Sequence, residues 1–150
     1  MIRRRLLLLP PALALIASCG PPPPAVVDLT IKAGPDLNRN AAGTPLAVAV
    51  RLYGLNARAR FMAADAFALM ERDRALLGDE GARSDEIVVR PGETRKVTMA
   101  PKPDVRFLGV AVLFQDIDRA QWMAIAPIAA SGTTRLVLTL SSNKAVLESA

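Results

Sequence analysis

The chain has 150 residues, 51% of them hydrophobic but only 4% aromatic, which suits one domain with an aliphatic core and excludes a disordered chain. It has no histidine, the commonest general base and metal ligand, and a single cysteine, so an internal disulfide is excluded. The formal net charge is +5, but Arg3, Arg4 and Arg5 supply three of these charges. No basic stripe alternates with aromatic residues, so we expect no nucleic-acid partner.

Residues 1–18 have the pattern of a secretory signal peptide. The three arginines precede an apolar run from Leu6 to Ala17, which is too short to span a bilayer. The run ends in Ile16-Ala17-Ser18-Cys19 and resembles the lipobox of bacterial lipoproteins, in which the cysteine is acylated and becomes the mature N-terminus. We therefore predict lipidation at Cys19; the alternative is a plain signal peptide with an incidental cysteine.

The residues after the cysteine predict a short tether. Residues 19–25 contain four consecutive prolines, which form a stiff polyproline spacer of about 3 Å per residue. Gly20 rather than an aspartate follows the cysteine, and by resemblance to Gram-negative lipoproteins this favours the outer membrane. We expect a folded domain over residues 26–141, held close to the periplasmic face of that membrane.

The first two strands of this domain are predicted from alternation of apolar and polar residues. Val27, Leu29 and Ile31 alternate with polar neighbours, and the period of two returns over residues 46–53, where Val50 is expected in the core. Residues 34–44 between these strands are dense in glycine, proline, asparagine and aspartate, so they predict a loop.

A helical insertion is predicted after the second strand, at about residues 63–78. Asp65 is a good N-cap, because its carboxylate can accept hydrogen bonds from free backbone N–H groups. Phe67, Met70 and Leu77 recur at helical spacing and predict a core-facing stripe, and Gly78 ends the run.

The rest of the domain reads as short strands separated by turns. Residues 86–90 and 95–99 are expected to pair as a hairpin across Pro91 and Gly92. The run 107–114 is apolar on both faces and predicts a central strand containing Val110, and residues 122–125 and 134–140 predict two more. Residues 142–150 have weak patterning and predict a tail. About seven to eight short strands indicate a mainly β protein, a β-sandwich.

The order of these features resembles the outer-membrane lipoprotein family of the type VI secretion system, called TssJ. The resemblance covers about residues 16–128. It is carried by the lipobox and, in order, by Ile31-Lys32-Ala33, Asp36-Leu37-Asn38, Gly43, Pro45, Val50-Arg51-Leu52-Tyr53-Gly54-Leu55, Asp65-Ala66-Phe67-Ala68-Leu69, Leu76-Leu77-Gly78, Pro91-Gly92, Gly109-Val110-Ala111 and Trp122.

The resemblance implies a transthyretin-like β-sandwich with a small helical addition, acting as a structural part of the secretion envelope complex. It also implies binding to the periplasmic domain of the inner-membrane subunit TssM, in part through the loop between the first two strands. We expect Leu37, the apolar residue of that loop, to be the anchor, and Pro35, Asp36, Asn38 and Arg39 to surround it. The alternative is that Leu37 folds back over the end of the sandwich as a plug.

Nothing in the sequence indicates catalysis, a metal site or a cofactor. The acidic pairs, such as Asp116 with Asp118, read as solvated turns, and the serines have no histidine to activate them. We therefore expect a non-enzymatic protein with no small-molecule substrate. The competing hypothesis is a periplasm-facing lipoprotein module that binds a small ligand or a cell-wall fragment.

Overall fold

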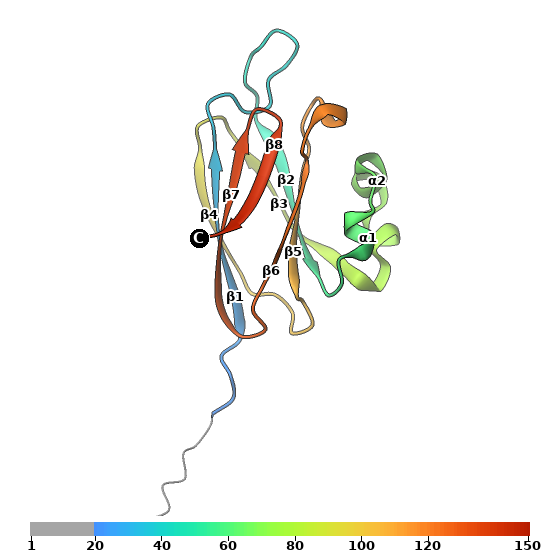
Figure 1. The fold of residues 1–150 in the computed structure, drawn as a ribbon, viewed down its shortest axis with the longest axis vertical. Helices are drawn as coiled ribbons and strands as arrows, with labels where there is room; N and C mark the ends of the chain where they lie inside the picture. Colours follow the sequence, from blue (N-terminus) through green and yellow to red (C-terminus); the bar gives the residue numbers. More distant parts are fainter. Residues whose placement is uncertain (1–19) are drawn as a thin grey trace, which may run out of the picture.

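The computed structural model describes residues 20–150, which fold into two stacked four-stranded sheets with a helical layer on one side (Figure 1). The first sheet has the order β4-β1-β7-β8 and the second the order β3-β2-β5-β6. The strands are β1 (Ala25–Ala33), β2 (Val48–Leu55), β3 (Gly81–Val89), β4 (Thr94–Met99), β5 (Phe107–Val112), β6 (Met123–Pro127), β7 (Gly132–Ser141) and β8 (Lys144–Ser149). This arrangement confirms the mainly β sandwich with a helical insertion after the second strand.

The core between the sheets is built from the alternating positions that the sequence predicts. Leu29 and Ile31 of β1 face Val50 of β2 and Val110 of β5, and all four side chains are buried. Strand β1 lies in the middle of its sheet, antiparallel to β4 and parallel to β7. Burial of these aliphatic side chains is the main force that holds the sheets together, since about 25 cal/mol is gained per Å² of apolar surface removed from water.

The helical insertion, α1 (Ala59–Met62) and α2 (Ala66–Leu77), covers the outer face of the second sheet. Phe61 of α1 is buried against the Tyr53 ring, with 5.4 Å between ring centroids, and reaches β5 beside Gly109. The predicted N-cap is confirmed, because Asp65 Oδ1 accepts a hydrogen bond of 3.1 Å from the Ala68 N–H. The insertion explains why β5 is apolar on both faces: one face meets the core and the other meets the helices.

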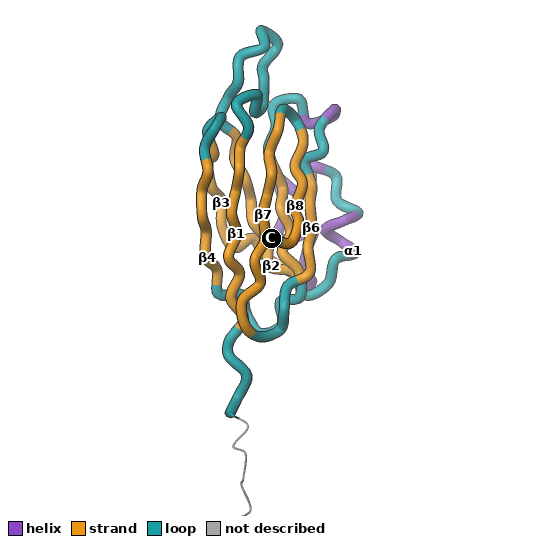
Figure 2. Tube along the Cα trace, turned by 60° about the vertical axis from the view of Figure 1, so that its left-hand side comes forward, coloured by secondary structure: helices purple, strands orange, loops and turns teal. Residues whose placement is uncertain are grey.

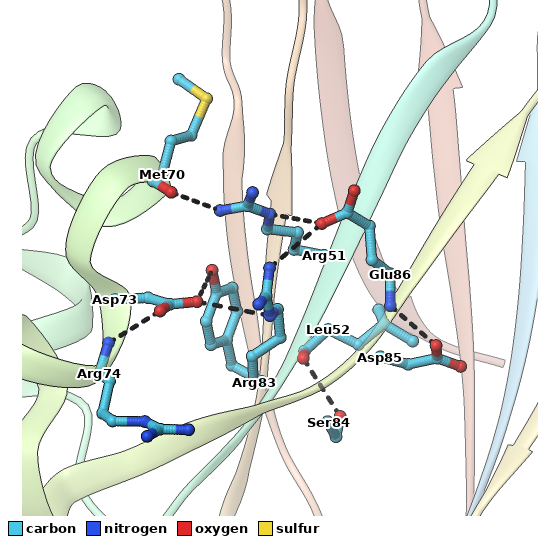
Figure 3. Close-up of polar contacts among 10 residues, drawn as sticks. Arg51, Leu52, Met70, Asp73, Arg74, Arg83, Ser84, Asp85 and Glu86 are labelled. Atoms are coloured by element: carbon cyan, nitrogen blue, oxygen red, sulfur yellow. Dashed lines mark hydrogen bonds and ion pairs between the residues drawn. The ribbon is translucent and has the colours of Figure 1, made fainter.

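A half-buried arginine of the second sheet, Arg51, contacts α2 next to a kink. Arg72 leaves helical geometry, with φ −147° and ψ 46°, and the Arg74 N–H donates to Asp73 Oδ1 at 2.8 Å. Arg51 Nη1 donates to the Met70 carbonyl at 2.9 Å, while its Nε contacts Glu86 at 2.7 Å (Figure 3). The guanidinium therefore ties α2, just before the kink, to β2 and to Glu86 of β3.

A second polar contact joins the same helix to the sheet. The Tyr53 hydroxyl donates to Asp73 Oδ2 at 3.3 Å, and Arg83 Nε lies 3.5 Å from the same oxygen. Burial raises the pKa of the Tyr53 hydroxyl, so this donor keeps its proton at neutral pH.

Two expectations about the helical insertion are wrong. It begins earlier than residue 63, because α1 already forms from Ala59. Phe67 is 54% exposed and is not part of the core, whereas Ala66, Leu69 and Leu77 are the buried residues of α2. The helix starts with Ala66 against the sheet, so Phe67, the next residue, faces solvent. The buried stripe is therefore displaced from the one that Phe67 and Met70 predict.

Two expectations about strand pairing and the chain end are also corrected. Strands β3 and β4 flank the Pro91-Gly92 turn but do not form a hairpin: β3 pairs with β2 in the second sheet and β4 with β1 in the first. Residues 142–150 are not a tail, since residues 144–149 form β8 on the edge of the first sheet. Leu138 of β7 opposite Leu147 and Leu140 opposite Ala145 give this weakly patterned strand its apolar contacts.

Candidate partner-binding surface at the distal end

Four connections gather at the end of the sandwich opposite residues 20–24, and we call this the distal end (Figure 1). They are residues 34–47, 90–93, 113–122 and 142–143. Figure 2 shows that the longest of them, the β1–β2 loop, extends beyond the ends of both sheets. Its base is tied to its neighbours by main-chain hydrogen bonds: the Gly34 N–H donates to the Leu140 carbonyl at 2.7 Å, and the Gly92 N–H to the Gly34 carbonyl at 3.2 Å.

Leu37 in the β1–β2 loop is fully buried, with 0% of its surface exposed. It belongs to the main core and closes the distal end of the sandwich, and its carbonyl accepts the Leu46 N–H at 3.0 Å across the base of the loop. The expectation of Leu37 as an exposed anchor for a partner is therefore wrong in this structure. The alternative, a plug over the end of the sandwich, is the arrangement observed, since an apolar residue gains more from the open end of the core than from water.

Asn38 is a buried hub rather than part of a polar rim. Its side chain is 7% exposed, its Nδ2 donates to the Ala47 carbonyl at 3.0 Å, and its Oδ1 accepts the Gln115 N–H at 2.8 Å. Its own N–H donates to the Ser142 carbonyl at 2.6 Å, so one residue connects three of the four distal segments. The backbone there has φ 49°, a left-handed conformation that asparagine tolerates better than most residues.

The exposed part of the loop is its tip, residues 39–44. The Asn40 carboxamide orders it, because Oδ1 accepts the N–H groups of Ala42 and Thr44, both at 3.0 Å. Gly43 has φ 80° and donates its N–H to the Asn40 carbonyl at 2.9 Å, which completes a tight turn. Arg39, Ala42 and Thr44 face solvent on this turn. The tip therefore presents exposed side chains from a backbone that is already ordered.

The five residues predicted to contact the partner thus divide into two groups. Pro35 and Arg39 are exposed and Asp36 is half-buried, so these three remain accessible. Leu37 and Asn38 support the loop from inside. Sequence reasoning missed this division and the role of Asn40, although Asn40 and Gly43 are residue types typical of tight turns, and that signal was available.

A cleft of about 380 Å³ lies at the opposite end of the sandwich, and we call it the proximal cleft. Val27, Leu108 and Ile128 of the core reach it, and Met99 and Val105 line it as well. It falls within the size range of small-ligand sites, which are mostly apolar with a few polar groups. It is the structural feature that the competing hypothesis of a ligand-binding module requires.

Cys19, the predicted lipidation site, lies outside the described residues. Among residues 20–150, no helix is long and apolar enough to cross a membrane.

Within the same residues no three acidic or cysteine side chains gather into a group that could hold a metal ion. Asp116 and Asp118, the acidic pair in the connection between β5 and β6, lie at a short 3₁₀ turn and are exposed.

Residues 25–143 match the model of the family described as type VI secretion lipoprotein, which includes VasD, EvfM and TssJ. The chain belongs to this family. The resemblance read from the sequence is thereby confirmed, and the matched span contains every strand except the last. None of the curated proteins is similar enough in sequence to count as a match.

Solved structures agree with the family assignment. The lipoprotein TssJ1 from Pseudomonas aeruginosa is 32% identical, with a TM-score of 0.81 over 85% of this chain and 98% of that one. Lip from Serratia marcescens, a membrane-bound component of the type VI secretion system, is 23% identical with a TM-score of 0.77 over 85% and 98%, a likeness of fold. A chain in a structure described as the TssM C-terminal domain (869–1107) from EAEC is 28% identical, with a TM-score of 0.70 over 83% and 98%.

Proposed function

We propose that this type VI secretion lipoprotein is tethered to the periplasmic face of the outer membrane through acylated Cys19 and binds the periplasmic domain of TssM through the tip of the β1–β2 loop. In this proposal residues 1–18 are the signal peptide and residues 19–25 the lipidated tether. The observation that carries it is the position of the exposed tip, which projects from the end of the sandwich opposite the tether. A protein held by one end to the outer membrane presents that tip toward the inner membrane.

The match to a structure named for TssM supports the choice of partner. The alignment covers 83% of the 150 residues of this chain and 98% of the matched chain. The matched chain is therefore similar in length to this one and somewhat shorter. The printed TssM range, 869–1107, is much longer. The matched chain is therefore a second, shorter protein beside the TssM domain, and it has the fold of this lipoprotein.

The order of the tip favours binding. A loop whose tip is already ordered by the Asn40 carboxamide, and whose base is tied by the Asn38 side chain, loses little conformational entropy when a partner contacts it. Arg39 adds an exposed guanidinium, and arginine is enriched in protein interfaces.

Substituting the exposed tip alone tests the interface. We expect the double substitution Arg39→Glu with Ala42→Glu to lower the affinity for the TssM periplasmic domain at least tenfold, about 1.4 kcal/mol, with the thermal midpoint unchanged. The reason is that both side chains face solvent, so acidic groups there disturb only a bound partner. Calorimetry or biolayer interferometry with the purified TssM domain gives the affinity. Lys96→Glu, a charge reversal at an exposed position of β4, is the matched control. Equal affinities for the tip variant and this control would place the interface elsewhere.

The anchor has a separate test. We expect Cys19→Ser to block acylation and to release the protein from the outer-membrane fraction, because a membrane anchor depends on the buried CH₂ groups of its acyl chains. Sucrose-gradient fractionation of the envelope measures this, and Ser18→Ala, which keeps a small residue before the cysteine, serves as the control. A Cys19→Ser protein that still sediments with the outer membrane would rule out the lipid anchor.

The second candidate function, binding of a small ligand, is favoured by one observation, the proximal cleft. It does not compete for the same surface, since the cleft and the loop tip lie at opposite ends of the sandwich.

A further inference from the structure

The proximal cleft opens on a side of the sandwich that no strand of residues 20–150 closes. Strand β3 is the edge of the second sheet and β4 the edge of the first, and the two edge strands are not paired with each other. The cleft lies between the start of β3 and the end of β4, and Val27, Leu108 and Ile128 of the core form part of its lining. An apolar side chain or an acyl chain that enters it would therefore reach the main core of the protein.

The position of the cleft relative to the tether is the second observation. Most of its lining comes from the beginnings of β1, β3 and β5, from the ends of β2 and β4, and from the connections at residues 100–106 and 128–131, all at the end where residues 20–24 enter the domain (Figure 1). Cys19 precedes Ala25 by six residues, and a polyproline segment of that length spans about 19 Å. If Cys19 is in the membrane, the cleft lies within reach of the bilayer surface.

The rim of the cleft carries charged groups of both signs. Two of them already have partners. Arg83 forms an ion pair with Asp73 at 3.5 Å, and Asp79 forms one with Arg60 at 3.4 Å. Lys102 and Asp104 are two residues apart in the β4–β5 connection, and neither forms a salt bridge with another described residue. The main chain orders this connection, since the Val105 N–H donates to the Lys102 carbonyl at 3.0 Å. One free ammonium and one free carboxylate at the mouth of an apolar cleft match a ligand with an apolar tail and a head group of both charges.

We propose that the proximal cleft takes one acyl chain of a zwitterionic membrane phospholipid, with the phosphate against Lys102 and the amine of the head group against Asp104. The proposal rests on the outer-membrane tether described above. Binding of this kind gives the domain a second contact with the bilayer and fixes its orientation, so that the loop tip points away from the membrane. No bond is made or broken in this step.

Photolabelling from the bilayer tests the proposal. The mature lipidated protein is reconstituted into vesicles of phosphatidylethanolamine and phosphatidylglycerol that contain phosphatidylethanolamine with a diazirine near the end of one acyl chain. After illumination and digestion, we expect the label on the segment 99–108. Ala82→Trp, which fills the cleft from β3, is expected to lower this labelling about fivefold or more, because the indole takes the volume of the chain. Val88→Trp, at an exposed position of the same strand outside the cleft, is expected to leave it unchanged.

A second variant and two readouts keep the outcomes distinct. Ala100→Trp fills the cleft from the β4–β5 connection and is expected to have the same effect as Ala82→Trp, with thermal unfolding measured for both. The proposal would be overturned if the label were confined to residues 19–25, or if neither tryptophan substitution reduced the labelling of residues 99–108. It would also be overturned if the cleft stayed unlabelled because the protein's own acyl chain occupied it. Vesicle flotation and TssM binding are measured on the same samples. Failure of flotation for the unaltered protein contradicts the anchor, whereas normal flotation without cleft labelling contradicts the lipid site alone.

Discussion

Replacing Leu37 with alanine is expected to lower the free energy of unfolding by about 2–5 kcal/mol, a cost typical of removing a fully buried leucine side chain. Leu37 is inside the core at the distal end, and the loop around it is tied by hydrogen bonds from Asn38 to Ser142 and to Ala47, so the site collapses poorly around the cavity. Urea unfolding followed by circular dichroism measures the change, and the m-value shows whether the native state stays compact.

Arg39→Ala in the same loop is the matched control, and its free energy of unfolding is expected to stay within about 0.5 kcal/mol of the unaltered protein, because its side chain is exposed. Binding to the TssM domain, measured well below the unfolding midpoint, separates the two roles of Leu37. A plug leaves the affinity of the folded Leu37→Ala protein close to normal. A small change in stability together with a large loss of affinity would restore the anchor interpretation.

The strands of the sandwich core could be predicted because their burial is periodic. Alternation at Val27, Leu29 and Ile31 gives β1, and Val50 lies where the second alternation places it. The unbroken apolar run of β5 correctly predicts a central strand, and the structure adds the reason, a helical layer on its second face. For these elements the local pattern and the tertiary environment agree.

The functional loop could not be predicted in the same way because it has no period. A leucine in a polar loop indicates only that an apolar group needs a partner, and the sequence does not decide between a pocket on another protein and the open end of its own core. The role of Asn38 is equally ambiguous from sequence. Its left-handed backbone and its hydrogen bonds to Gln115 and Ser142, which lie 77 and 104 positions later in the chain, exist only after the sheets are assembled. The predicted loop was therefore right in place and wrong in the roles of its two central residues.

Strand pairing shows a related limit. The Pro91-Gly92 turn forms, with Gly92 at φ 75°, and the strands beside it were predicted within a few residues of their ends except for the start of β3. Turn chemistry reports the local reversal of the chain, but β4 pairs with β1, more than 60 residues earlier, instead of with β3. The competition between edges of two sheets is settled by long-range packing, which a turn motif does not contain.

Replacing Phe61 with alanine is expected to lower the free energy of unfolding by about 3–5 kcal/mol, the usual cost of removing a buried phenylalanine. Phe61 is fully buried between α1 and the second sheet, and its ring packs against the Tyr53 ring at a tilt of 52°, so its loss leaves a cavity under the helical layer. Met62→Ala is the matched control, because Met62 is the next residue of the same short helix and is 52% exposed. Equal changes for the two variants in urea unfolding would contradict the assignment of Phe61 as the residue that fixes the insertion.

Gly109 provides a direct test of this packing. A Cβ at Gly109 would lie 2.9 Å from Phe61 Cζ and 2.9 Å from Leu55 Cδ1, so Gly109→Ala alone is expected to destabilise the protein by overpacking. In the Phe61→Ala background one of these two contacts is gone and a cavity is present, so the same methyl group is expected to cost less. The double-mutant cycle should therefore give a coupling energy of about 0.5–3 kcal/mol in favour of the double variant. Strict additivity would mean that Phe61 does not pack on β5 at Gly109, and that α1 contacts the sheet in another way.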